Sequence, residues 1–214
     1  MTKWLVVPIL LLTLSPPALQ ASEVREISQK FEVAEGQKLR IDIPVGEVEI
    51  EAGDRAQVEA ELTVRCRWNL ADCRHAVEQL ELVERSTSRR MTIELSGLPR
   101  WHGTTLDIEG IILVPKDTPL EVKMGVAKLD ITGVEKDLRI DVGVGKVRVW
   151  MPEAQIGRAL LDVGVGEVEL LGAPGQASGR RSFLVGSEVH WDDGPGQARV
   201  DIEVGVGEIT LWLD

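Results

Sequence analysis

Two aspartates at equivalent places of a repeated unit are the residues best suited to bind a cation or to act on a sugar. Asp141 and Asp162 each lie four residues before a glycine of the repeat described below. If the repeats stack in chain order, the two carboxylates are cross-strand neighbours and repel each other. The pair could hold a Ca²⁺ ion, could belong to a polysaccharide-cleaving β-helix, or could form a solvated acidic surface. We expect the solvated surface, with no metal and no catalytic residue.

Two tryptophans suggest a second kind of site. Trp150 and Trp212 occupy the same outward position of two repeats, a position that holds Leu171 and Asp192 in two others. This partial apolar stripe could bind a saccharide or a protein. Alternatively, it could be covered by the predicted helix or by loops of the same chain. The chain has no tyrosine and two phenylalanines, a composition that does not favour a sugar-binding surface.

The two cysteines are predicted to form a disulfide. Cys66 and Cys73 are the only cysteines of the chain, and in an oxidising compartment a single pair most simply joins. A metal site with His75 is the alternative, but two thiols and one imidazole do not complete the usual four-ligand shell. A redox motif needs the spacing Cys-x-x-Cys, which is absent.

No catalytic constellation emerges from the remaining residues. His75, His102 and His190 lie in unrelated contexts, and no nucleophile elbow, zinc-protease, phosphate-loop or dinucleotide motif occurs. The Gly-x-Gly pairs sit inside alternating segments and lead into no helix. We therefore expect a protein that is not an enzyme and that needs no cofactor.

A sequence repeat that recurs along the chain must position these residues. Its anchors Gly145, Gly166, Ser187 and Gly207 are 21, 21 and 20 residues apart, and earlier copies are anchored on Gly46 and Ala127. The clean copies read LRIDVGVGKVRVW, ALLDVGVGEVELL and DIEVGVGEITLW, and the copy at Ser187 is degenerate. A strand-like unit with a period of about 20 residues predicts a stack of β-coils, a β-solenoid.

The alternation within each copy predicts two strands and a corner. After the anchor, apolar residues occupy the second and fourth positions, and before it they occupy the first, third and fifth. An uninterrupted strand would place Val144 and Val147 on opposite faces, so the chain must bend if both face one core. We expect Gly46, Gly145, Gly166 and Gly207 to form this corner. Val144, Val165 and Val206 should then form a column in the interior.

The segment before residue 120 is less regular. Strand-like alternation from Val58 to Val64 is followed by apolar residues at helical spacing, which predict one short helix near Leu70–Leu80. A hairpin with its tip near residues 86–90 comes next. We expect residues 22–214 to form one domain, with an irregular part at 39–119 and regular coils at 120–214.

The first 21 residues resemble a secretory signal peptide. Lys3 precedes an apolar run from Trp4 to Leu14, and small residues follow. The run is about 11 residues, against the roughly 20 that span a bilayer, so we expect cleavage and no membrane anchor. The formal net charge of −11 argues against binding to nucleic acid or to anionic lipid.

The recurring D-V-G-V-G-x-V units of an exported chain resemble a bacterial β-strand-repeat family that carries the name "putative adhesin" and is a domain of unknown function. The resemblance covers Leu120–Asp214 and one copy at Leu39–Glu51. It implies a β-helical or solenoid protein of the bacterial envelope, in the periplasm, at the cell surface or secreted, and no established activity.

We therefore expect a non-enzymatic interaction module for an envelope protein or polysaccharide. The alternative is a β-helix that binds or cleaves polysaccharide. Because the chain stops at Asp214 directly after a strand, we also expect an open sheet edge there, through which the protein could self-associate.

Overall fold

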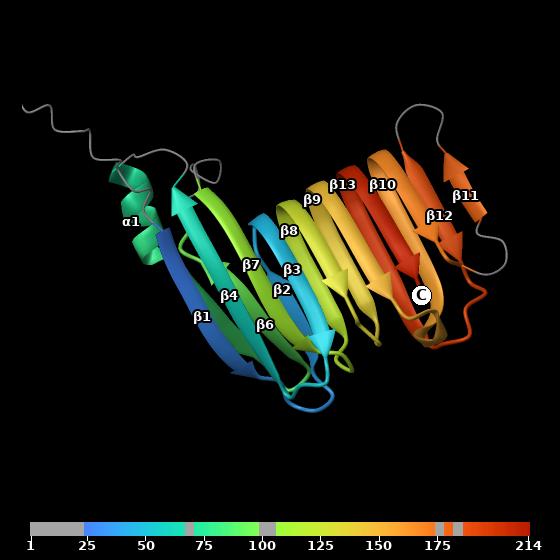
Figure 1. The fold of residues 1–214 in the computed structure, drawn as a ribbon, viewed down its shortest axis with the longest axis horizontal. Coiled ribbons are helices and arrows are strands. Elements are labelled where there is room, and N and C mark those ends of the chain that lie inside the picture. The colour runs from blue at the N-terminus through green and yellow to red at the C-terminus, as the bar shows by residue number, and fades with distance from the viewer. Residues whose placement is uncertain (1–23, 67–70, 99–105, 174–177, 182–185) are drawn as a thin grey trace, which may run out of the picture.

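The computed structural model describes residues 24–66, 71–98, 106–173, 178–181 and 186–214. They form an all-β structure with one short helix (Figure 1), as the sequence predicts. The strands are β1 (Val24–Glu32), β2 (Lys38–Asp42), β3 (Val45–Gly53), β4 (Gln57–Cys66), β5 (Glu81–Ser86), β6 (Arg90–Ser96), β7 (Leu106–Pro115), β8 (Leu120–Thr132), β9 (Leu138–Met151), β10 (Ile156–Leu171), β11 (Ser178–Arg181), β12 (Ser187–Trp191) and β13 (Ala198–Leu213). The helix α1 comprises Ala71–Gln79, and a 3-10 turn, η1, comprises Glu153–Gln155. The expected leader, residues 1–21, lies outside the described residues.

The described strands belong to one mixed, 13-stranded sheet that forms two layers. The first half of β8 pairs with β2, whereas its second half pairs with β3. In Figure 1, β2 and β6 lie behind β3 and β7. Each long strand thus gives its first half to one layer, called here the first layer, and its second half to the other, the second layer. The sheet remains open, and a closed β-helix is not formed by the described residues.

A continuous apolar core fills the space between the layers. In β9 the residues Ile140 and Val142 of the first layer and Val147 and Val149 of the second layer are all at most 1% exposed. The equivalent residues of β8 and β13 are buried with them in the same cluster. Each such side chain contributes about 1.5–3 kcal/mol by leaving water, so the repeated apolar positions drive the stacking.

The strand halves meet at a corner, but the valines there do not face the core. Val126, Val144, Val206 and Val165 do form a column through strand pairing. They are nevertheless 43–55% exposed. The prediction of an interior column was therefore wrong. Because the chain turns from one layer to the other between Val142 and Val147, it adds outward residues at the bend, and Val144 is one of them.

The corner glycines are required by close backbone approach. Gly46, Gly145, Gly166 and Gly207 have φ angles between 145° and 152°, which side chains rarely permit. A Cβ on Gly207 would also overlap the carbonyl oxygen of Gly145 in the adjacent strand. Backbone contacts of this kind link β9, β13 and β10 across the corner.

The strands do not stack in chain order, contrary to the prediction. The order in space is β8, β9, β13, β10, so the last clean copy lies between the first and second clean copies. Strand β13 runs parallel to both neighbours and pairs with each along its length. The expected open edge at the C-terminal strand is therefore wrong.

Two short connections allow this insertion. The link from β9 to β10 passes the end of β13, where the Glu153 amide donates to the Asp214 carbonyl at 2.9 Å. The loop that leads into β13 runs against the start of β10, where the Gly196 amide donates to the Ile156 carbonyl at 2.9 Å. Any side chain at Gly196 would collide with the Gln155 backbone, so glycine permits the crossing.

The degenerate copy does not form a coil. Strand β12 runs antiparallel to the first half of β10, and β11 pairs with β12. Trp191 at the end of β12 points inward and is 1% exposed. This pair of short strands extends the first layer.

The two ends of the sheet differ in how their last strands are paired and covered. At one end β1 pairs with β4, and its Arg25 Nη1 donates to the Val77 carbonyl of α1 at 2.7 Å. At the other end, the second half of β10 pairs with β13 on one side only among the described residues. There Val168 and Leu170 are half-buried, whereas their partners Ile209 and Leu211 are at most 1% exposed.

Candidate binding surfaces

The acidic residues singled out from the sequence lie on the outer face of the first layer but are not neighbours. Glu203 of β13 lies between Asp141 of β9 and Asp162 of β10. The row continues to Glu188 of β12, and Lys123 of β8 lies 3.8 Å from Asp141. Among the described residues, no group of three or more acidic, histidine or cysteine side chains has the geometry of a metal site. The row is a ladder of exposed carboxylates.

The predicted tryptophan stripe forms a stacked pair on the outer face of the second layer. The rings of Trp150 and Trp212 are parallel within 4°, with centroids 4.5 Å apart. The Arg148 guanidinium lies 5.9 Å from the Trp150 ring centroid. A sugar stacks on a ring face, and the mutual stacking occupies one face of each ring. The arrangement favours a structural cross-strand pair, and a binding role for this surface stays a prediction.

Ion pairs surround the tryptophans. Arg148 Nε donates to Asp130 Oδ1 at 2.6 Å, and this hydrogen bond raises the pKa of Arg148 above its ordinary value. Lys146 lies 2.5 Å from Glu208. Stacking in chain order would have placed Glu167 of β10 beside Lys146 of β9, but β13 separates the two strands. A similar arrangement near the β7–β8 turn raises the pKa of Lys116, through hydrogen bonds to Glu135 and Asp54.

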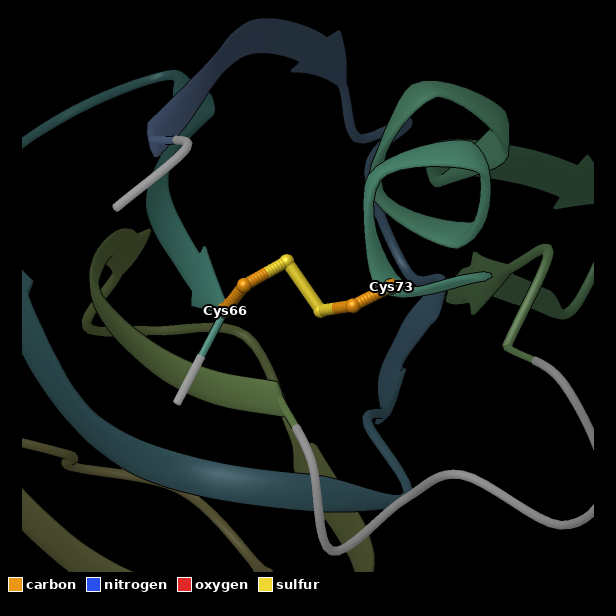
Figure 2. Close-up of a disulfide and its surroundings, with 2 residues drawn as sticks. All are labelled: Cys66 and Cys73. Carbon is orange, nitrogen blue, oxygen red and sulfur yellow. A yellow bond between two sulfur atoms is a disulfide. The ribbon is translucent and has the colours of Figure 1, made fainter. Parts of the chain in front are cut away.

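The cysteines are joined, as predicted. Cys66 at the end of β4 and Cys73 on α1 form a disulfide with Cα atoms 6.0 Å apart (Figure 2). Both residues are buried, at 6% and 3% exposure. His75 lies on the exposed side of α1, where Gln79 is 3.2 Å from its Nε2. The bridge attaches the helix to the sheet. Because both sulfur atoms are in the disulfide, neither is a thiol that could bind a metal with His75.

A cationic pocket on the outer face of the first layer was missed from the sequence. Its volume is about 380 Å³. Arg139 of β9, Arg199 of β13 and Arg158 of β10 line it, together with Lys38, Asp137 and Asp201. Leu160, 38% exposed, and His190 complete the wall next to β12.

The arginines converge because of the unexpected strand order. Arg158 and Arg199 each lie eight residues before a corner glycine, so the repeat places them at the same height. Stacking in chain order would have set Arg158 beside Asp137, which directly precedes β9. The insertion of β13 makes Arg199 the cross-strand partner of Arg158 instead. The common offset from Gly166 and Gly207 was the available signal, but it is informative only once β13 and β10 are known to be adjacent.

Comparison with known proteins identifies structural relatives. No family model matches the chain, and no curated protein matches it. A crystal structure described as a "putative cell adhesion protein" from Clostridium sporogenes aligns with a TM-score of 0.54 and 15% identity. The alignment covers 90% of this chain and 100% of that one. This similarity shows a shared fold.

Two further crystal structures align with lower scores. One described as a "putative adhesin" from Bacteroides fragilis has a TM-score of 0.26, 9% identity and coverage of 87% and 97%. Another described in the same way, from Parabacteroides merdae, has a TM-score of 0.24, 9% identity and coverage of 89% and 97%. The fold assignment rests on the Clostridium structure.

No helix among the described residues is long and apolar enough to cross a membrane.

Proposed function

We propose that this protein is an exported, non-enzymatic, adhesin-like interaction module of the bacterial cell envelope. The observation that carries the proposal is the similarity along the full length of the Clostridium sporogenes protein described as a "putative cell adhesion protein". The leader-like start of the sequence supports export to the periplasm or beyond. The regular glycine corners and the D-V-G-V-G units support membership of the β-repeat family that the sequence resembles, and with it a solenoid-like design.

The layered sheet suits such a role because it presents rows of outward side chains at a regular spacing. Adjacent strands lie about 4.8 Å apart, and five of the repeats place charged residues at equivalent outward positions. A partner with its own regular spacing, such as an envelope polysaccharide or a repetitive envelope protein, can contact several rows at once. Contacts made together raise the overall avidity above that of each contact.

Binding of the purified mature chain to envelope particles tests the proposal. We expect cosedimentation of the wild-type protein with isolated envelopes, saturable and sensitive to salt because the outer faces are charged. A Val204→Asp variant places an unpaired charge in the core and should unfold, so it controls for non-specific adhesion. Equal cosedimentation of the folded and unfolded chains, or none of either, would contradict the proposal.

The non-enzymatic part has its own test. Incubation of the protein with a panel of envelope polysaccharides, followed by measurement of new reducing ends and unsaturated ends, should show no product. Protein-dependent turnover that is lost in Asp141→Asn or Asp162→Asn would establish the alternative, a polysaccharide-cleaving protein.

A further inference from the structure

The pocket between β9, β13 and β10 has a charge opposite to that of the whole protein. Lys38, Arg139, Arg158 and Arg199 line it, against the carboxylates of Asp137 and Asp201. Four cations and two anions leave an excess of positive charge, whereas the full chain carries a formal net charge of −11. A local reversal of this kind attracts an anionic group to one place on the surface.

Two of the arginines face each other without a counter-ion. Arg158 and Arg199 are cross-strand partners, and the pairing shifts register between Ile156 and Arg158. Like charges directly opposite in a sheet are destabilising. Among the described residues, neither side chain has an ion-pair or hydrogen-bond partner; the Asp137 carboxylate accepts instead from the backbone amide of Arg199, at 3.0 Å. Two exposed guanidinium groups are therefore free to receive one anion.

The other residues of the pocket indicate which chemical groups the ligand carries besides its anionic group. Guanidinium groups bind carboxylates through paired hydrogen bonds. Asp201, which lies 3.6 Å from Arg139, and Asp137 present oxygens that accept hydrogen bonds from hydroxyl groups. Leu160, the cross-strand partner of Asp201, adds an apolar patch. Cationic donors, anionic acceptors and an apolar patch together match a sugar that carries a carboxylate, hydroxyls and a C–H face.

The surroundings disfavour a polyanion that lies along the sheet surface and an anionic membrane. The row of Asp141, Glu203 and Asp162 lies four residues or fewer along the same strands from the pocket residues and faces the same way. Those carboxylates would repel a phosphate backbone or a charged lipid surface laid across the layer. A single anionic group that enters the pocket avoids them. The volume of about 380 Å³ falls within the range of roughly 300–1,000 Å³ that is typical of small-ligand sites.

We propose that this pocket binds the terminal uronic-acid residue of an acidic polysaccharide, with its carboxylate held between Arg158 and Arg199 and the rest of the polymer directed away from the sheet. The inference rests on the proposed role as an envelope interaction module and names its ligand class. Arg139 and Asp201 orient the sugar through its hydroxyls, and Leu160 contacts its apolar face.

Titration calorimetry with a galacturonate hexamer tests the proposal on the mature wild-type chain. We expect binding that weakens with salt and falls at least about tenfold in Arg158→Gln/Arg199→Gln, since each variant side chain loses hydrogen bonds to a charged group. The matched control is Arg65→Gln/Arg85→Gln, which removes equal charge on other strands and should change the affinity less than about twofold. The fully methyl-esterified hexamer should bind at least about tenfold more weakly than the acid.

The thermal midpoint separates loss of binding from loss of fold. Because Arg158→Gln/Arg199→Gln relieves a like-charge contact, its midpoint should equal or exceed that of the wild type. Equal binding of the acid and the ester, or unchanged affinity in the Arg158/Arg199 variant, would overturn the proposal. Binding of inorganic phosphate without binding of uronate would also overturn it, because it would indicate a phosphate site. Wild-type self-association that this variant abolishes would indicate a carboxylate from a second copy of the chain, and would overturn it too.

The experiments distinguish failure of the uronate proposal from failure of the proposed function. If the wild-type protein cosediments with envelopes and the Arg158/Arg199 variant does so equally well, the uronate proposal fails while the interaction role stands. If wild-type protein binds the soluble hexamer but no envelope particle, the pocket assignment stands and the envelope role fails.

Discussion

At the scale of residues, identical side chains two positions apart have opposite environments. Val204 and Val206 both belong to β13, but Val204 is 0% exposed and Val206 is 46% exposed. Gly205 lies between them, and the corner glycine Gly207 follows. The alternation of an ordinary strand would give both valines the same face. The bend toward the second layer turns Val206 outward, so its apolar character does not contribute to the core.

This difference predicts unequal effects of the same mutation. Val204→Ala should lower the free energy of unfolding by about 2 kcal/mol, because it removes two buried methyl groups and leaves a cavity. Val206→Ala should change it by less than about 0.5 kcal/mol, as at an ordinary surface site. Urea denaturation of the two variants measures both values. Similar losses would mean that the valine column is buried in solution, by self-association or by a bend that differs from the one described.

At the scale of elements, the helix depends on its attachments. α1 has nine residues, fewer than an isolated helix needs to be stable in water. On its inner side Cys73, Ala76 and Val77 are buried, as is Leu80 directly after the helix. The disulfide holds its first turn and Arg25 binds carbonyl groups of its last turn. A side chain from β1 thereby satisfies carbonyls that have no partner within the helix.

Removal of the disulfide should reduce stability by a predictable amount. The bridge closes a loop of sequence separation 7, for which the chain-entropy relation gives about 2.5 kcal/mol. Cys66→Ser/Cys73→Ser should lose this amount in chemical denaturation under oxidising conditions. The wild-type protein in the presence of a strong reductant is the matched comparison and should lose a similar amount. No difference between oxidised and reduced protein would show that the bridge does not form in solution.

At the scale of the whole molecule, the position of the last strand determines how the sheet is finished. β13 is enclosed by β9 and β10, so the C-terminal segment is part of the interior of the sheet. The strand with one described neighbour is instead the second half of β10, with Val168 and Leu170 half-buried. A second strand added there could bury both residues further. Any self-association through a sheet edge is therefore expected at β10.

Hydrogen exchange tests this arrangement. Amides of Ile209–Leu213 should exchange slowly, because both sides of β13 are paired. In Gly166–Leu171 alternate amides point away from β13 and should exchange much faster than the others. If β13 exchanges faster than β10, the strand order is wrong. Uniform protection across Gly166–Leu171 at low protein concentration would show that another segment of the chain pairs with this edge.

Local patterns in the sequence predicted the repeat, the all-β class, the need for glycine at the corner, the short helix and the cysteine pairing. These depend on local properties: alternation identifies inward positions such as Val147 and Val149, and the shift of phase around Gly145 requires a bend. Alternation could not place Val144, because its orientation depends on how the backbone turns between the layers. Strand β1 was also unpredicted, since most of its residues are exposed and its sequence has no clear period.

Which repeats are neighbours depends on long-range contacts in the folded chain. The clean copies present the same backbone ladder, the same glycines and similar apolar faces, so each can pair with any other. The cost of closing the connecting loops grows slowly with their length, and chain order is therefore a weak constraint. The crossing at Gly196 places β13 between β9 and β10, which separates Asp141 from Asp162 and brings Arg199 beside Arg158. The row of carboxylates and the cationic pocket both result from this long-range choice of partners, which no local pattern records.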